Sequence, residues 1–244
     1  MIIPTLDLHT HTVASGHGYS TIQEMAAAAK EKGIRILGIT EHGPSIEGTC
    51  VWLYFKNLFV VPKVIDGVRM LFGAEINILD TKGTLDMTEE QMGRLDLRIA
   101  GIHSQCWKGG SKAENTETVI NVMSNPMIDI ISHPADGTAD LDFETLVRAS
   151  KRYGTHLEIN NHSLHPVRHK TEAATNNLEL LRQAKRHDVP VILGSDAHVS
   201  FQIADYCFLE ALLKEADFPE ELILNDKPEL ILPKHNYDFS DCIN

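Results

Sequence analysis

The stretch ILGITEHGP, residues 36–44, places a histidine at the end of a run of apolar and β-branched residues. Such a run is typical of a buried strand, so His42 is expected at the carboxyl end of that strand. Five further stretches also carry metal-binding side chains at or just after the end of an apolar run: LDLHTHT with His9 and His11, LFGAEIN with Glu75, IAGIHS with His103, IDIISHP with His133, and VILGSDAH with Asp196 and His198.

Successive donors lie about thirty residues apart, which is the length of one strand, its helix and two loops. The interval from His133 to Asp196 is about twice as long, so one unit carries no donor in this pattern. His17 lies in the loop that follows the first expected strand. A donor at the same end of nearly every strand–helix unit indicates a shared site, because scattered core histidines would keep no such spacing. The sequence therefore predicts a metalloenzyme that binds several metal ions.

The same alternation predicts the secondary structure. A Gly-containing turn at residues 81–84 predicts a hairpin insertion over Ile78–Asp86. We expect Ser20 to cap the first long helix, and Gly33 and Gly154 to follow two of the helices. The expected helices are Ser20–Lys32, Val51–Val64, Ser111–Met123, Asp142–Tyr153 and Thr171–His187. The expected strands are Ile2–Leu8, Ile36–Thr40, Val68–Ile78, Leu97–Ile102, Ile128–Ser132, Thr155–Asn160 and Val189–Gly194.

Strands that alternate with helices predict a parallel sheet with helices outside it. An open sheet would collect ligands from only two or three strand ends. Here six strand ends supply donors, and they meet at one mouth only if the sheet closes into a barrel. We therefore expect an α/β fold, a seven-stranded TIM-like (β/α) barrel with its metal site at the carboxyl ends of the strands. No linker interrupts residues 1–244, which we expect to form one domain.

Composition narrows the classes of function. The chain has 244 residues and a formal charge of −12, with no Lys/Arg cluster, which disfavours nucleic-acid binding. No apolar stretch is long enough for a membrane helix, and the N-terminus lacks the features of a signal peptide. The four cysteines show no paired spacing, as in a reducing compartment. We expect a cytoplasmic protein that acts on a small molecule, with homo-oligomer formation left open.

The donor types indicate the kind of metal site. In a strand, residues two apart face the same side, so His9 and His11 can reach one ion. The carboxylate of Glu75 has two oxygens and can bridge two ions, whereas an imidazole binds one. All donors are nitrogen or oxygen and none is a thiolate, which favours an open catalytic site over a closed structural one. Zinc is the first expectation, with manganese or iron as alternatives.

Together the motifs HTH (9–11), TEHGP (40–44), GAEIN (73–77), GIHS (101–104), SHP (132–134) and SDAH (195–198), with His17, resemble those of the PHP superfamily. This superfamily is named for polymerase and histidinol phosphatase, and the resemblance is greatest to its small stand-alone phosphatases of the YcdX type. The resemblance implies a distorted barrel with three divalent metal ions. It further implies a first ion bound by His9, His11, Glu75 and Asp196, a second shared through Glu75 with His103 and His133, and a third bound by His17, His42 and His198.

One residue departs from the family pattern. Glu41 stands where the family often has an aspartate before the histidine. The resemblance implies a supporting role for this carboxylate rather than direct metal binding.

The expected activity is metal-dependent hydrolysis of small phosphomonoesters by a hydroxide that bridges the metal ions. Glu75 and Asp196 are the expected catalytic carboxylates, and a third ion gives the third phosphate oxygen a partner. Within the superfamily, a phosphodiesterase or exonuclease and a histidinol-phosphate phosphatase remain alternatives. An amidohydrolase would not need His17, His42 and His198. A non-catalytic metal-binding scaffold, the alternative from another class, would be marked by lost ligands, and none is lost.

The unit without a donor ends in EINNHSLHPVRHK, residues 158–170. Its polar, cationic loop is a candidate for substrate binding. We expect Arg168 to hold a substrate phosphate oxygen through its planar guanidinium, the alternative being a solvated loop arginine. Further candidates for substrate contact are Asn160, His162, His165 and His169.

Overall fold

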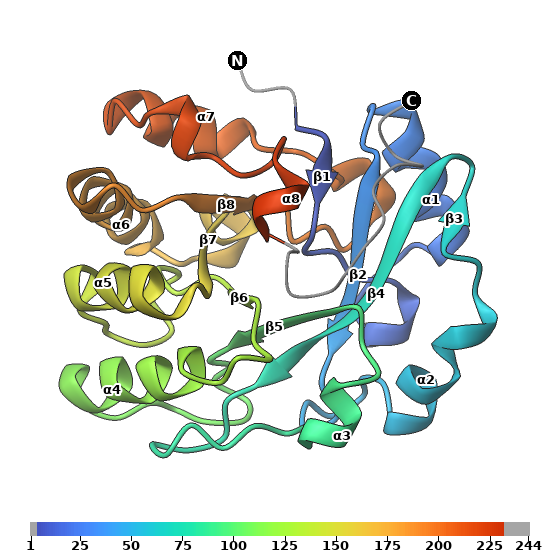
Figure 1. Ribbon diagram of the computed structural model, residues 1–244, viewed down its shortest axis with the longest axis horizontal. Coiled ribbons are helices and arrows are strands. Elements are labelled where there is room, and N and C mark those ends of the chain that lie inside the picture. Colours follow the sequence, from blue (N-terminus) through green and yellow to red (C-terminus); the bar gives the residue numbers. More distant parts are fainter. Residues whose placement is uncertain (1–3, 232–244) are drawn as a thin grey trace.

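A computed structural model describes residues 4–231 of the chain. Seven parallel strands curve into a nearly closed barrel with helices outside it (Figure 1). This arrangement confirms the expected fold; Ile2 and Ile3 of the first expected strand lie outside the described residues. In sheet order the strands are β1 (Leu6–Asp7), β2 (Ile36–His42), β4 (Val68–Asn77), β5 (Leu97–Gly101), β6 (Ile130–Ile131), β7 (His156–Asn160) and β8 (Val191–Gly194), with a short antiparallel strand β3 (Val64–Ile65) beside β4.

The helices follow the strands in chain order. Among residues 4–231 no helix is both long and apolar enough to cross a membrane. The four long helices expected from the sequence are present, while the short helices α3 and α8 and the nine-residue helix α7 were not anticipated. The helices are α1 (Ile22–Glu31), α2 (Trp52–Asn57), α3 (Glu89–Met92), α4 (Lys112–Met123), α5 (Phe143–Tyr153), α6 (Ala173–His187), α7 (Cys207–Glu215) and α8 (Pro228–Ile231).

Two details of the predicted helices were wrong. The cap of α1 is Thr21 rather than Ser20, because Thr21 and Glu24 form a reciprocal capping box while the Ser20 hydroxyl accepts a bond from Ser200 N. The expected helix over residues 51–64 ends early. It continues only as a 3₁₀ turn, Leu58–Val60, because Pro62 disfavours helical backbone at the residue before it.

Two smaller predictions are confirmed. Gly33 and Gly154 follow α1 and α5 with left-handed backbone, at φ 77° and 69°. The expected hairpin insertion is present, because Ile78 pairs antiparallel with Leu85 across the turn.

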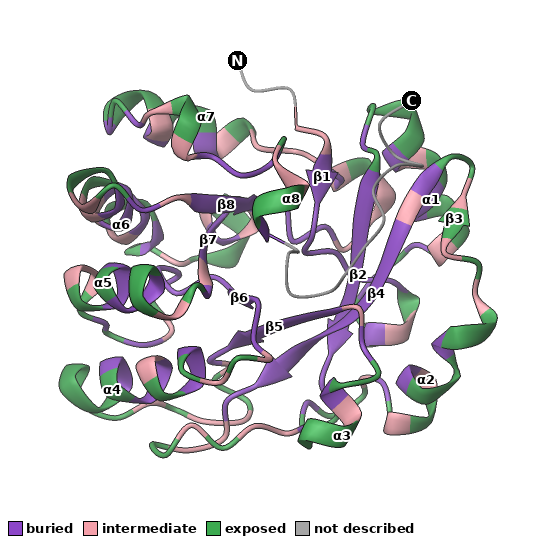
Figure 2. Ribbon diagram, in the orientation of Figure 1, coloured by how far each residue is buried: buried purple, intermediate pink, exposed green. Residues whose placement is uncertain are grey.

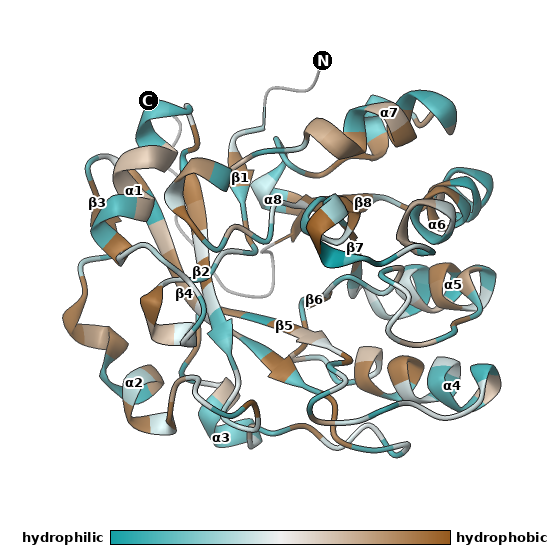
Figure 3. Cartoon of the chain, turned by 180° about the vertical axis from the view of Figure 1, so that it is seen from behind, coloured by the Kyte–Doolittle hydropathy of each residue, from teal (hydrophilic) through white to brown (hydrophobic). Residues whose placement is uncertain are grey.

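The barrel has an inner core and an outer core. The outer core lies between the strands and the helices. The outer faces of α4, α5 and α6 are exposed and mostly hydrophilic, whereas α2 exposes the apolar Leu53 (Figures 2 and 3). The inner core is closed at the amino-terminal end of the strands by α8, through Ile231. Its residues are Leu6, Leu8, Ile36, Leu71, Leu97, Ile99, Ile130, Ile192, Leu224 and Ile231.

Along a strand, every second side chain faces the barrel interior. These inward residues are apolar near the start of the strand and polar near its carboxyl end. In β4, Leu71 lies in the inner core, Gly73 follows two residues later, and Glu75 two residues after that. Ile192 and Gly194 of β8 are followed in the same way by Asp196. In both strands a glycine therefore separates the apolar residue from the carboxylate, and both carboxylates lie at the same end of the barrel.

Asn225 closes the gap between β8 and β1. Its backbone carbonyl accepts bonds from the backbone nitrogens of Thr5 and Leu6, at 2.8 and 3.1 Å. Its side-chain amide bonds the backbone N and O of Leu193, both at 2.8 Å. This fully buried side chain acts as a substitute peptide group, because it offers one donor and one acceptor to the edge of β8.

Replacing Asn225 by alanine is expected to lower the free energy of unfolding by about 3 kcal/mol, because buried peptide groups of Leu193 lose their partners. Urea unfolding monitored by circular dichroism measures this change. Asn121→Ala, an exposed position in α4, is the control and should change stability by less than about 0.5 kcal/mol. An Asn225→Ala protein as stable as the wild type would contradict this role.

Candidate metal centre

The structure brings all nine expected donors together at the carboxyl-terminal end of the barrel. His9 and His11 are buried at 2% and 0% exposure, below a cavity of about 640 Å³. The other seven line this cavity: His17, His42, Glu75, His103, His133, Asp196 and His198. Donors from six strand ends therefore share one site, which only a closed or nearly closed barrel permits.

Glu75 lies at the centre of the donors, and its two oxygens face different imidazoles. Oε1 lies 2.7 Å from His133 Nε2 and 3.1 Å from His103 Nε2. Oε2 lies 2.9 Å from His42 Nδ1. It also lies 3.3 and 3.4 Å from the Nε2 atoms of His9 and His11.

Asp196 is the second carboxylate of the site. Its Oδ1 lies 3.6 Å from His9 Nε2 and 3.3 Å from His11 Nε2. Its Oδ2 accepts a bond from the Asn160 side-chain amide at 3.3 Å. His9, His11 and Asp196 form one of the groups whose ligand atoms lie within 4.8 Å of one another.

A cluster of imidazoles lies at the side of the site near the loop after β1. The ring centroid of His17 is 5.0 Å from that of His42 and 4.7 Å from that of His198. The ring of His11 lies beneath them, 4.5 Å from His42 and 4.6 Å from His198. Ligand atoms of His11, His42 and His198 also lie within 4.8 Å of one another, so these rings can share an ion.

Most of the imidazoles have one ring nitrogen engaged by the protein. This contact fixes the ring orientation and leaves Nε2 to face the centre, as in known metal sites where an outer acceptor holds the ligating histidine. The Nδ1 contacts are His9 to Glu158 Oε1 at 2.8 Å, His11 to Ser15 Oγ at 3.2 Å, His17 to Ser15 O at 2.9 Å, His103 to Asn77 Oδ1 at 2.7 Å and His198 to Asp196 O at 2.9 Å.

Glu158 is a supporting residue that our sequence analysis missed. It is buried in β7, where one oxygen accepts from His9 Nδ1 and the other accepts from His133 N at 2.7 Å. Gly194 makes this position possible, because a Cβ there would lie 1.7 Å from Glu158 Oε1. The available signal was a carboxylate in the middle of an otherwise buried strand, which requires a partner.

Glu41 supports the site through hydroxyl groups. It is fully buried and accepts bonds from Thr12 and from Ser15 Oγ. Ser15 Oγ in turn contacts His11 Nδ1 and accepts a bond from His42 N. The carboxylate thus orients two neighbouring donors without facing the cavity itself.

Two of the donors lie on unusual backbone. His133 has φ 31° and Asp196 has φ 53°, both in the left-handed region that non-glycine residues rarely adopt. Strain of this kind is retained where the surrounding structure holds it, and it clusters at functional sites. Here the bond from His133 N to Glu158 helps to hold one of these conformations.

The electrostatics of the site favour a cation at its centre. Burial lowers the pKa of His42 and of His198 to about 3, so both imidazoles keep free lone pairs at neutral pH. Burial opposes ionisation of Glu75, but His9 and His103 hold its pKa well below the usual value. Burial likewise opposes the charge of His11, yet the adjacent carboxylates of Asp196 and Glu75 raise its pKa to about 9.

Two buried polar atoms without a hydrogen-bond partner indicate that these residues suit a metal ion. His42 Nδ1 and Glu75 Oε2 are 2.9 Å apart and buried, yet neither has a hydrogen-bond partner among the described residues. Buried polar atoms without partners are costly, and a cation between two lone pairs would satisfy both. The donor set is therefore suited to divalent metal ions.

The loop of the remaining unit borders the same cavity. Arg168 lines it from an exposed 3₁₀ turn, Pro166–Arg168, and no hydrogen bond or ion pair of its guanidinium is found within residues 4–231. His162 also lines it and stacks on His198, at 5.0 Å between centroids.

The other loop candidates are placed differently. Asn160 is buried and holds Asp196, so it serves the carboxylate rather than the cavity surface. His165 caps the turn and packs on Phe208, while His169 is exposed and is not among the cavity-lining residues.

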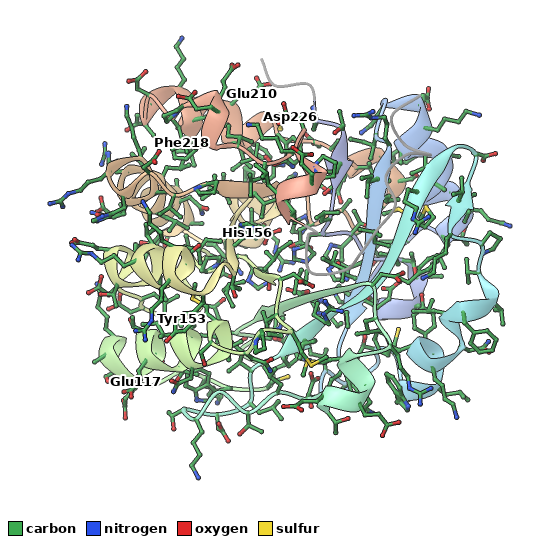
Figure 4. The ribbon with its side chains drawn as sticks, viewed as in Figure 1. Glu117, Tyr153, His156, Glu210, Phe218 and Asp226 are labelled. Carbon is green, nitrogen blue, oxygen red and sulfur yellow. The ribbon has the colours of Figure 1, made fainter. Side chains whose placement is uncertain are left out.

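Replacing Glu158 by glutamine is expected to lower zinc affinity about 10- to 100-fold, because the acceptor that orients His9 loses its charge. Competition with a chromophoric chelator measures the change. Glu117→Gln, on the exposed outer surface of α4 (Figure 4), is the matched control and should bind zinc as the wild type does. Equal affinities in both variants would contradict the orienting role of Glu158.

Comparisons with known proteins agree with this geometry. The PHP domain family matches residues 7–243. A probable phosphatase of Acetivibrio thermocellus is 44% identical over 92% of this chain and 92% of its own length. A probable phosphatase of Clostridium novyi is 42% identical over 93% and 92%.

A solved structure shares the fold at low sequence identity. Histidinol phosphate phosphatase from Lactococcus lactis, complexed with zinc, L-histidinol and phosphate, has a TM-score of 0.62 at 18% identity. The match covers 88% of this chain and 95% of that one. From the family match and the identity to these relatives, the chain belongs to the PHP domain family, as a phosphatase of that superfamily.

Proposed function

We propose that this protein hydrolyses small phosphomonoesters with three divalent metal ions, zinc being the first candidate and manganese or iron the alternatives. His9, His11, Glu75 and Asp196 would hold the first ion. Glu75 would share a second ion with His103 and His133. His17, His42 and His198 would hold the third.

The observation that carries this proposal is the position of Glu75. One of its oxygens faces His103 and His133, and the other faces His9, His11 and His42. A carboxylate between two groups of imidazole nitrogens is the expected ligand for two ions held close together. The unsatisfied atoms His42 Nδ1 and Glu75 Oε2 support metal binding at this carboxylate.

The cavity suits a small phosphorylated substrate. Its volume of about 640 Å³ is in the range of small-molecule sites. Bound divalent ions would neutralise phosphate oxygens and activate water as the nucleophile. Glu75 and Asp196 line the cavity with carboxylates, and Arg168, whose guanidinium has no partner among residues 4–231, would contact a phosphate oxygen from the same cavity. The histidinol phosphate phosphatase of Lactococcus lactis holds L-histidinol and phosphate, the alcohol and the phosphate that hydrolysis of such a phosphomonoester releases.

Metal content tests the three-ion site. Protein purified without chelator is expected to carry two to three equivalents of transition metal by elemental analysis. Glu75→Ala should lose more metal and more phosphatase activity than His17→Ala, because the bridging carboxylate holds two ions and His17 holds one. One equivalent or less in the wild type would contradict the site, and an active Glu75→Ala beside an inactive His17→Ala would contradict the bridge.

Variants of Arg168 test whether this residue binds the phosphate group of the substrate. Arg168→Ala should leave metal content unchanged and lower kcat/KM for phosphomonoesters about 10- to 100-fold, the worth of a lost charge-assisted contact. Arg168→Lys should recover only part of this loss, because a point charge cannot reproduce the planar guanidinium. Steady-state kinetics of both variants measures it. Wild-type rates in Arg168→Ala would show that the residue is an ordinary solvated arginine.

A further inference from the structure

We infer that Lys170 is a positioning residue of this site, which acts through Asp136 on the metal-binding histidine His133. The inference rests on the proposed metal site and extends it to two residues that supply no metal ligand. Lys170 lies in the loop after β7, the strand that already supplies the supporting residue Glu158.

Asp136 lies between Lys170 and His133 and contacts both. It follows His133 by three residues in the loop after β6, is 4% exposed, and its Oδ2 lies 3.6 Å from His133 Nδ1. Its other contacts within the loop are to Thr138, whose backbone N and Oγ1 donate at 2.7 and 2.8 Å. The carboxylate is therefore held with one oxygen toward the far side of the His133 ring, while Nε2 of that ring faces Glu75.

Lys170 compensates this buried carboxylate. Its ammonium group contacts Asp136 Oδ2, the same oxygen that faces His133. Lys170 comes from the loop between β7 and α6, so the contact crosses from one strand–helix unit to the next. A buried charge whose partner is removed is left uncompensated, and the Asp136 carboxylate would then turn away from the ring toward solvent. Lys170 thus helps to keep the Asp136 carboxylate beside the His133 ring, 3.6 Å from Nδ1.

The alternative is that Lys170, which also lines the cavity, binds substrate directly. A positioning role and a substrate-binding role of Lys170 change different quantities. A positioning role changes metal affinity, because histidine ligands depend on their outer acceptors. A direct role changes KM for the substrate and leaves metal affinity as it was.

The test measures zinc affinity by chelator competition, with steady-state kinetics on p-nitrophenyl phosphate as a separate readout. Lys170→Met is expected to weaken the binding of one zinc equivalent about tenfold. Lys170→Arg should restore most of the affinity, because it returns a cation to Asp136. Lys112→Met is the matched control, since it breaks an exposed contact to Asp140 of the same loop at 3.6 Å without involving Asp136, and it should bind zinc as the wild type does.

A double-mutant cycle keeps the test informative if single variants are unstable. Asp136→Asn preserves the shape of the side chain and should reproduce the loss in Lys170→Met, and the double variant should be no worse than either single variant. Additive losses, or unchanged zinc affinity with a raised KM in Lys170→Met, would overturn the inference. An equal loss in Lys112→Met would overturn it too. The zinc measurements do not depend on turnover, so failure of the proposed phosphatase activity would be recognised separately.

Discussion

The structure depends on one constraint: a carboxylate with no solvent exposure, Glu75, lies among five imidazoles at the mouth of a barrel. Buried charge is tolerated only where opposite charge or hydrogen-bond donors compensate it. The imidazoles that surround Glu75 come from several strand ends, and the rings of His9, His11 and His103 are each held through Nδ1 by a partner away from the centre. The outer contacts of Glu158, Asn77 and Ser15 are therefore consequences of this central carboxylate, because rings free to rotate could not keep their nitrogens toward it.

The rest of the barrel places this polar layer above an apolar one. Alternate residues of a strand face the same side, so one strand can supply Leu71 to the inner core and Glu75 to the site. Glycine between them leaves the space in which side chains from neighbouring strands reach across, as Glu158 does beside Gly194. At the opposite end α8 covers the inner core, and Asn225 joins β8 to β1. The amino-terminal ends of the strands therefore form the inner apolar core, and their carboxyl-terminal ends carry the metal-binding side chains.

The unit without an expected metal donor supplies residues that support or border the site. Its strand supplies Glu158 and Asn160, which support donors from other units. Its loop supplies Arg168 and Lys170, the two cations that line the cavity. Two cationic side chains on one side of the cavity would attract an anionic substrate toward that side.

Much of this arrangement was determined by the sequence itself. The strand–helix alternation and the helix end at Gly154 are local features, and local periodicity predicts them. The seven parallel strands follow from that alternation. The donors were predictable for a related reason. A parallel barrel brings the carboxyl ends of all its strands to one mouth, so spacing along the chain translates into convergence in space.

Only the tertiary structure decided the contacts between units. His9 and Glu158 are 149 residues apart, and Lys170 meets Asp136 across two loops. No periodicity links such pairs, because their contact depends on the twist of the barrel and on which side chain fills the space beside a glycine. The same holds for Thr21 as the cap of α1, since Ser20 is engaged by Ser200 from the far end of the chain. The sequence determined which groups reach the mouth of the barrel, and packing decided which partner holds each of them there.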